Sequence, residues 1–128
     1  PVQFNISHSG EIVVCAICEK SLIGIDIEII SEISIEDCKW QMRENEWDTI
    51  ISSDKIEESF FNYWTQKEAV IKANGLGLTI PLTTFEVLDG IAQINDQKFF
   101  LKEIKIDERY KCYISSDRDI DEFFLKKI

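Results

Sequence analysis

Proline and glycine are scarce in this chain of 128 residues, which holds two prolines and five glycines. Their scarcity leaves no Pro- or Gly-rich linker between candidate domains, and no low-complexity stretch interrupts the chain. The length suits one domain with one hydrophobic core. We therefore expect a single domain over residues 1–128.

Long apolar runs are missing too. The longest, such as Ile12–Cys18, are far shorter than the roughly 20 residues that a membrane-spanning helix needs. The first residues show no secretory signal and lead directly into a strand-like segment. Hydrophobic residues still make up 45% of the chain, which argues against disorder. The composition is that of a globular protein.

Positive charge is in short supply, since the formal net charge is -10. This balance opposes non-specific binding to nucleic acid, because phosphates attract basic surfaces. It still permits an anionic small ligand, since lysines or a bound metal can reverse the field within one cleft. We expect neither a nucleic acid nor a membrane as a partner.

The four cysteines form no recognisable metal or disulfide framework. Cys15 and Cys18 have the spacing of a zinc knuckle, but they lie in the strand-like run IVVCAIC, where side chains three residues apart point to opposite faces. The sequence has no second close Cys or His pair to complete four zinc ligands. We expect reduced, mostly buried thiols, including Cys38 and Cys112, and a cytoplasmic location.

Alternation of apolar and polar residues predicts strands near both ends of the chain. The first two, Gln3–Ser7 and Glu11–Cys18, would be joined by a tight turn at His8-Ser9-Gly10. A third strand lies within Ser21–Ile29. The later strands are expected at Phe85–Leu88, Ile91–Ile94, Phe99–Ile106 and Tyr110–Ser115.

A long helix is expected between these two groups of strands. Apolar residues recur at helical spacing from Phe60 to Ala73. Ser53 or Asp54 would cap the start of this helix, and Gly75 would end it.

Two further segments, Ser34–Ile51 and Asp119–Lys127, are compatible with helix. Their positions fit a chain in which strands and helices are segregated rather than alternating. The predicted fold class is α+β, with one long helix packed on an antiparallel sheet.

Two acids share one face of the third predicted strand. Asp26 and Glu28 lie two residues apart, so both carboxylates project to the same side. Crowded carboxylates repel each other unless a cation lies between them, and all-oxygen ligands suit Mg²⁺. Alone, the pair fits a solvated strand face as well as a metal site.

Charged residues on the long helix form a second candidate. Glu68 and Lys72 are four residues apart and share a helix face with Trp64. A surface ion pair would explain them, but this helix is so apolar that Lys67, Glu68 and Lys72 are expected in a narrow polar strip. His8 is the only histidine, and at a hairpin turn it fits a plain surface residue or a ligand contact.

Taken in order, the motifs resemble those of the 4′-phosphopantetheinyl transferases, in particular the two-lobed type that activates surfactin synthetase and other peptide synthetases. The matching segments are Ser7-His8-Ser9, Gly24-Ile25-Asp26-Ile27-Glu28, Trp64-Thr65-Gln66-Lys67-Glu68-Ala69-Val70-Ile71-Lys72 and Gly75-Leu76-Gly77-Leu78. They cover the first two thirds of the chain. The resemblance implies Mg²⁺-dependent transfer of 4′-phosphopantetheine from coenzyme A to a serine of an acyl or peptidyl carrier protein, with release of 3′,5′-ADP.

The resemblance also implies roles for acids and lysines of these motifs. Asp26, Glu28 and Glu68 would hold Mg²⁺ against the pyrophosphate of coenzyme A. Glu68 would also take the proton from the carrier serine. Lys67 and Lys72 would contact phosphates, with Lys72 placed at the departing 3′,5′-ADP.

Two other motifs are implied to bind coenzyme A. Ser7 and His8 resemble a turn that contacts its phosphates. Gly75 and Gly77 belong to a loop that lies near the pantetheine arm in the family. The implied reaction needs no protein nucleophile, which agrees with the lack of a recognisable Ser-His-Asp set.

The chain departs from the two-lobed pattern in one major respect: only the second lobe and the hairpin before it are recognisable. Either the chain is a fragment whose first lobe was lost or lies on another chain, or copies of the chain self-associate and build sites between them. Gln41-Met42 replaces a pair of aromatic residues at the implied carrier contact.

Two rival functions remain. One is a non-catalytic half-domain that binds a carrier protein or a partner lobe. The other is a generic Mg²⁺-dependent phosphohydrolase, which would leave the segment from Trp64 to Lys72 unexplained.

Overall fold

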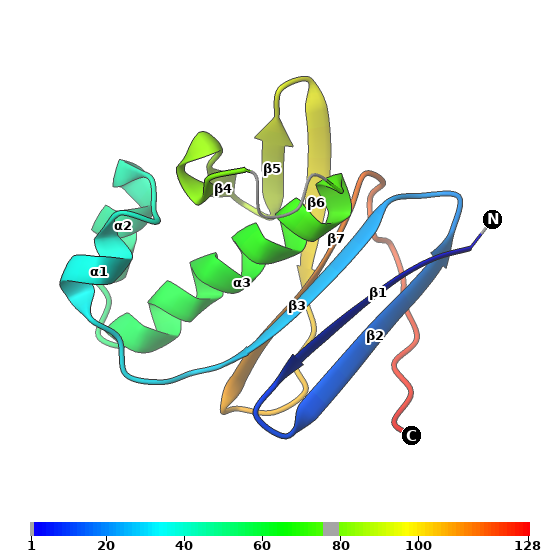
Figure 1. Cartoon of the computed structure of the whole chain (residues 1–128), viewed down its shortest axis with the longest axis horizontal. Helices are drawn as coiled ribbons and strands as arrows, with labels where there is room; N and C mark the ends of the chain where they lie inside the picture. Colours follow the sequence, from blue (N-terminus) through cyan, green and yellow to red (C-terminus); the bar gives the residue numbers. More distant parts are fainter. Residues whose placement is uncertain (1, 76–79) are drawn as a thin grey trace.

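The computed structural model describes residues 2–75 and 80–128 and contains two sheets and one long helix (Figure 1). The smaller sheet is a hairpin of β1 (Val2–Ser9) and β2 (Ile12–Glu19). The larger sheet is antiparallel throughout, with the strand order β3-β7-β6-β5-β4. Its strands are β3 (Ile23–Ile29), β4 (Val87–Leu88), β5 (Ile91–Ile94), β6 (Gln97–Glu103) and β7 (Tyr110–Ser116).

The helices lie between β3 and β4 in the sequence. Two short ones come first, and α3 then crosses the larger sheet and contacts mainly β3 and β7 (Figure 1). Gly75 ends α3 with a φ of 81°, a left-handed conformation that costs glycine little. The helices are α1 (Ile35–Lys39), α2 (Glu44–Ile51), α3 (Ile56–Asn74) and the single 3₁₀ turn η2 (Leu82–Thr84). The predicted α+β class is confirmed.

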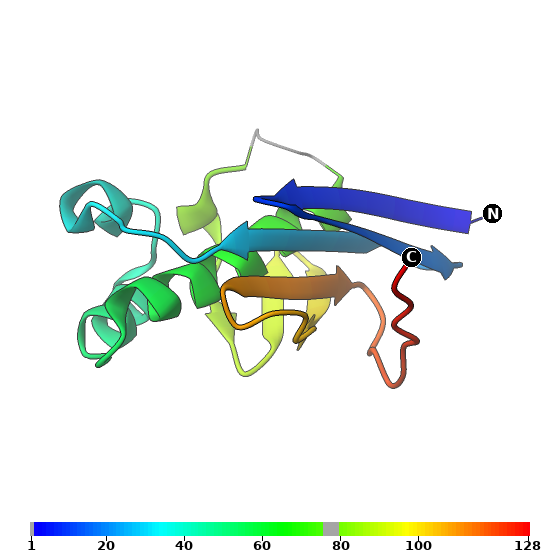
Figure 2. The ribbon, with the colours of Figure 1, turned by 90° about the horizontal axis from the view of Figure 1, so that it is seen from below.

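Alternation along β3 divides its side chains between two environments. Ile25 and Ile27 are buried in one cluster with Ala16 of β2 and Cys112 of β7, so the hairpin covers this side of β3. The intervening Asp26 is therefore directed to the side on which α3 packs, where its partner Lys72 lies. Figure 2 shows the hairpin alongside β3, with the C-terminal tail near β2.

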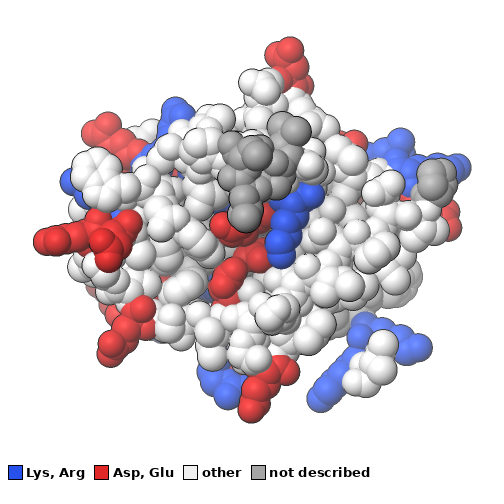
Figure 3. Space-filling model, in the orientation of Figure 1, with Lys and Arg blue, Asp and Glu red and all other residues white. Residues whose placement is uncertain are grey.

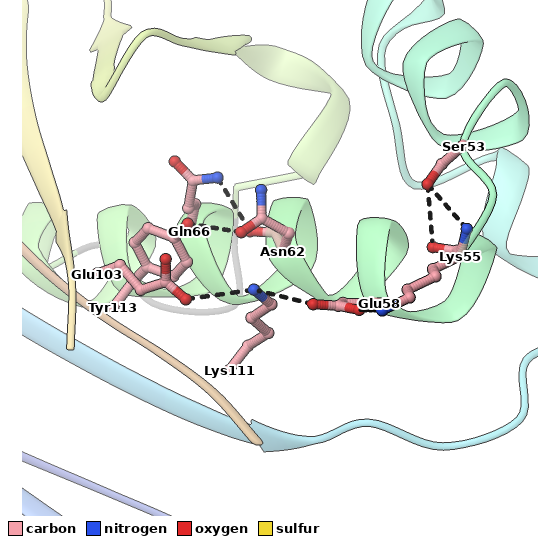
Figure 4. A network of polar contacts seen from close by, with 8 residues as sticks. All are labelled: Ser53, Lys55, Glu58, Asn62, Gln66, Glu103, Lys111 and Tyr113. Atoms are coloured by element: carbon pink, nitrogen blue, oxygen red, sulfur yellow. Dashed lines mark hydrogen bonds and ion pairs between the residues drawn. The ribbon is translucent and has the colours of Figure 1, made fainter. Parts of the chain in front are cut away.

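A polar seam fixes the first half of α3 to the larger sheet (Figure 4). The ammonium of Lys111 lies 3.2 Å from a carboxylate oxygen of Glu103 and 3.7 Å from one of Glu58. One turn along α3, the Tyr113 hydroxyl donates to the side-chain oxygen of Asn62. These contacts use a helix face different from the one that carries Trp64, Glu68 and Lys72.

The hairpin, β3, β5 and the end of α3 lie where the sequence predicted them, within two residues. The predicted continuous segment Ser34–Ile51 is instead split into α1 and α2, because the Glu46 carboxylate accepts the Arg43 N–H at 2.9 Å and starts a new helix there. The N-cap prediction for α3 was wrong as well: Lys55 precedes its first residue, and the Ser53 hydroxyl bonds to Lys55 in the turn before it.

The predicted tail helix over Asp119–Lys127 was wrong, because this described segment has no regular structure. Ile120 packs against the core, but Phe124 is 89% exposed, so the tail has little apolar surface to pack against. The four cysteines are free as expected, although only Cys112 is buried and Cys15 is exposed. Among the described residues, no helix combines the length and apolarity needed to cross a membrane.

Candidate active site

Polar side chains of β1, rather than its backbone, hydrogen-bond to the edge of β3. Three alternate residues of β1 each offer a side-chain oxygen to a backbone N–H of β3. The three bonds run from Ile25 to Asn5, from Ile27 to Ser7 and from Ile29 to Ser9, at 2.9, 3.1 and 2.9 Å. The edge of β3 is thus satisfied without a backbone ladder, and the seam places Ser7 beside Asp26.

Gly24 allows α3 to lie directly on β3. A Cβ atom at this position would come within 2.2 Å of the Ala69 carbonyl oxygen and 2.5 Å of the Ala73 N atom. Backbone atoms of a helix cannot give way locally, so only glycine fits this approach. The contact brings the last turns of α3, and with them Lys72, against the middle of β3.

Asp26 is the centre of the resulting polar cluster. Its Oδ1 accepts from the Ser7 hydroxyl at 3.2 Å and from the Lys72 ammonium at 3.1 Å. Lys72 also donates to the Ile25 carbonyl oxygen at 3.0 Å. The second oxygen, Asp26 Oδ2, is buried and has no hydrogen-bond partner within the described part of the chain. A buried carboxylate oxygen without a donor is costly, so this atom is suited to a cation.

The other two predicted acids lie within electrostatic reach of Asp26. Burial, followed by the neighbouring Asp26 carboxylate and then the charge of Glu68, raises the pKa of Glu28 from 4.5 to about 8, against an opposing hydrogen bond from Trp64. Burial and then the charge of Asp26 also raise the pKa of Glu68, while Lys72 lowers it. Glu28 and Glu68, whose ionisation the Asp26 carboxylate disfavours, form with it a site that a positive charge would stabilise.

Figure 3 shows acidic side chains and a basic one close together at the centre of the face that Figure 1 presents, over the region of α3 and β3. Within residues 2–75 and 80–128, however, no three His, Cys, Asp or Glu side chains are close enough to hold a metal ion together. In this part of the structure, therefore, the carboxylates of Asp26, Glu28 and Glu68 do not form one ligand set for a metal ion. Mg²⁺ commonly takes only one or two carboxylates and completes its shell with water and phosphate, and Asp26 with Glu28 fits that smaller requirement.

Lys67 does not lie with Glu68 and Lys72, contrary to the sequence prediction. Its side chain is fully buried and forms an ion pair with Glu46 of α2, over the ring of Phe85. Glu46 also accepts the Val87 N–H at 2.8 Å, so the pair joins α2, α3 and β4. Burial lowers the pKa of Lys67, an effect that Glu46 opposes. In this arrangement Lys67 holds three elements together and is not beside the acids; its contact with phosphates stays a prediction.

Ser7 and His8 are separated by the alternation of β1. Both belong to the strand, since the turn begins at Gly10. Ser7 is buried against Asp26, whereas the exposed His8 points to the opposite face beside Val13. The structure does not bring His8 to the carboxylates. Strand periodicity alone could have revealed this separation.

Two functional contributions were not assigned from the sequence. The close packing at Gly24 is one, and the Asn5 bond to β3 is the other. A glycine within a strand next to two acids was the available signal for the first. Of the two predicted loop glycines, Gly75 ends α3 and Gly77 lies outside the described residues.

Comparison with known proteins agrees with this arrangement. The model of the 4′-phosphopantetheinyl transferase superfamily matches residues 22–121, a segment that includes β3, α3 and all the acids discussed above. The chain belongs to this superfamily.

Relatives in the superfamily include the 4′-phosphopantetheinyl transferase Sfp of Bacillus subtilis, 38% identical over 121 residues, which are 88% of this chain and 54% of the relative. The 4′-phosphopantetheinyl transferase gsp of Aneurinibacillus migulanus is 40% identical over 119 residues, with 87% and 50% covered. The chain thus spans about half the length of the curated relatives it matches. The crystal structure of Thermotoga maritima holo-[acyl-carrier-protein] synthase shares the fold, with a TM-score of 0.58 and 16% identity over 75% of this chain and 62% of that one.

This superfamily member also carries an exposed apolar surface. On the hairpin face opposite Ser7, Phe4 lies across from Ile17, and Ile6 lies across from Cys15. Phe4, Ile6 and Ile17 are 66%, 53% and 69% exposed. An exposed apolar strand face of this kind is typical of an interaction surface.

Proposed function

We propose that this chain is the catalytic half of a Mg²⁺-dependent 4′-phosphopantetheinyl transferase, which moves 4′-phosphopantetheine from coenzyme A to a serine of an acyl or peptidyl carrier protein. The observation that carries the proposal is the packing of the Glu68–Lys72 turn of α3 against Asp26 of β3 in a member of this superfamily. This reaction needs charged groups of β3 and of α3, which lie far apart in the sequence, at one place.

In the proposed reaction, the carrier serine oxygen forms a bond to the β-phosphorus of coenzyme A, and the bond from that phosphorus to the bridging oxygen breaks. Glu68, as a carboxylate, accepts the serine proton. Lys72 donates to the phosphate of the leaving 3′,5′-ADP and balances its charge. Asp26 and Glu28, with Glu68 nearby, would hold Mg²⁺, which supplies counter-charge for the diphosphate when bound.

We place the missing half of the two-lobed relatives on the apolar hairpin face. Phe4 and Ile17 supply the surface, and the exposed His8 lies on the same face. On this proposal His8 contacts coenzyme A in the cleft that the first lobe completes, rather than beside Asp26. Self-association through the same face is the other arrangement, and the cytoplasmic location expected from the cysteines stays a prediction.

The decisive assay incubates the chain with coenzyme A, Mg²⁺ and an apo carrier protein, alone and with the missing half of a two-lobed relative supplied. Mass spectrometry should show the carrier heavier by one phosphopantetheine group. Glu68→Ala should lower the rate about 10²- to 10⁴-fold, as expected for loss of a general base. Glu57→Ala, an exposed acid in the first turn of the same helix, is the matched control and should change little.

A carrier-binding module without catalysis is the second candidate, motivated by Gln41-Met42 in place of a pair of aromatic residues at the implied carrier contact. It predicts carrier binding that is the same for the parent chain and Glu68→Ala, with no mass added in any combination. Absence of transfer even with the first lobe of a two-lobed relative present would refute the enzyme proposal.

A further inference from the structure

Lys72 is held against the carboxylate to which a cation would be expected to bind. Its ammonium donates to Asp26 Oδ1 and to the Ile25 carbonyl oxygen at 3.1 and 3.0 Å. The Ser7 hydroxyl occupies the same Oδ1 at 3.2 Å. In this state Asp26 is neutralised by a residue of its own chain.

Access to solvent differs between the two partners. The Asp26 side chain is 5% exposed and that of Lys72 is 29% exposed. The acid is therefore fixed by its surroundings, whereas the ammonium lies at the end of a flexible four-carbon stem with an open route outward. If one member of the pair moves, it is Lys72.

We infer that Lys72 is an internal counter-ion, which occupies the place of the divalent cation beside Asp26 and leaves it for the diphosphate of the substrate when that cation binds. The inference rests on the proposed function, since it takes the diphosphate as the natural anion. Two cations at one buried carboxylate repel each other strongly. A divalent ion that approaches the free Asp26 Oδ2 therefore competes with the ammonium on Oδ1 for the charge of the carboxylate, whereas metal and diphosphate together give the ammonium a new partner.

The consequence is positive coupling between the metal and the anion. Without a diphosphate, the divalent ion competes with Lys72 and binds weakly. With a diphosphate present, the competitor is drawn away and the same carboxylates bind the ion more tightly. Coenzyme A and metal would then bind as a unit, and the free ion would seldom occupy the site.

The test uses Mn²⁺ as a spectroscopic probe and pyrophosphate as the anion, with the 128-residue chain. The electron paramagnetic resonance signal of free Mn²⁺ gives the dissociation constant from the protein without pyrophosphate; with pyrophosphate, the Mn²⁺–pyrophosphate complex measured in the absence of protein is subtracted first. Parent protein should bind Mn²⁺ at least about tenfold more tightly when pyrophosphate is present. Lys72→Met retains the apolar stem but has no charge, so it should bind Mn²⁺ alone at least about tenfold more tightly than the parent, a change worth about 1.4 kcal/mol. It should also lose most of the gain from pyrophosphate.

Two controls separate displacement from general charge effects. Lys98→Met makes the same change in net charge at a side chain that lies over the Phe100 ring, and its Mn²⁺ affinity should equal that of the parent. Lys72→Arg keeps the positive charge, so its Mn²⁺ affinity without pyrophosphate should stay weak.

An unchanged or lower Mn²⁺ affinity in Lys72→Met would overturn the inference, as would an equal gain in Lys98→Met or in Lys72→Arg. If the transfer assay succeeds in either case, the proposed function stands and only the inference falls. If no variant binds Mn²⁺ even with pyrophosphate and no transfer occurs, both are wrong.

Discussion

Replacing Gly24 by alanine tests whether close packing of α3 on β3 assembles the site. The new Cβ would lie 2.2 Å from the Ala69 carbonyl oxygen and 2.5 Å from the Ala73 N atom, whereas ordinary contact begins at 3.4 Å. The helix would have to move outward by about 1 Å, because both obstructing atoms belong to its backbone. Such overpacking costs about 1 to 3 kcal/mol of stability.

The same shift should cost more activity than stability. Lys72 would be drawn away from Asp26, and a displacement of about 1 Å at reacting groups lowers rates roughly 100-fold. Urea unfolding measures the first effect, and the carrier-modification assay, run at a temperature where the variant is folded, measures the second. Gly90→Ala is the matched control: its φ of 75° penalises alanine by about 1 to 2 kcal/mol, but the nearest atom is 3.4 Å away and lies in β6.

Gly24→Ala and Gly90→Ala should therefore lose similar stability, and only Gly24→Ala should lose activity. If Gly24→Ala unfolds within about 0.5 kcal/mol of the parent and keeps its rate, the contact between α3 and β3 does not position the acids. Equal loss of activity in both variants would mean that stability alone limits the reaction.

Two further predictions concern buried ionisable groups. Lys67→Met leaves the buried Glu46 carboxylate without its ion-pair partner and should lower the free energy of unfolding by about 3 to 5 kcal/mol, measured with guanidinium chloride. The double variant with Glu46→Gln should recover part of this loss. A loss below about 1 kcal/mol in Lys67→Met would contradict the buried pair. The raised pKa of Glu28, about 8 against 4.5 for the free residue, means that the folded chain binds this proton more tightly than the unfolded chain. Its contribution to stability is complete below pH 4.5 and is lost as the pH rises through 8. In the absence of divalent ions, the parent should therefore lose about 1 to 2 kcal/mol between pH 5 and 8.5, discounted for partial exposure. Glu28→Gln should lose less, because among the acids of the site only Glu68 then keeps a raised pKa; parallel urea profiles for the two proteins would show that Glu28 is not perturbed.

Sequence patterns predicted correctly those elements that are fixed by residues close to them in the sequence. The hairpin from β1 to β2 follows from alternation and a glycine turn, and the end of α3 follows from Gly75. Pairing of Asp26 with Lys72 was anticipated only through the resemblance to a family. Spacing alone could not join residues 46 positions apart.

The errors have physical causes that a single sequence hides. Lys67 was placed at the surface because lysine is rarely buried, and its partner Glu46 lies 21 positions away in another helix. Helical spacing separates Lys67 from the face shared by Glu68 and Lys72, but it does not show that Lys67 is buried against another helix. The tail after Asp117 has helix-compatible spacing, but a short helix needs a surface to pack on.

The side-chain hydrogen bonds between β1 and β3 limit where this domain can be truncated. The superfamily match begins at residue 22, which invites a shortened chain starting at Leu22. Such a chain would lose the acceptors that Asn5, Ser7 and Ser9 give to β3, and would leave three backbone donors in a row along a strand edge. That edge could recruit any passing strand, so the shortened protein would tend to polymerise through β3, and Asp26 would lose the hydroxyl that orients it.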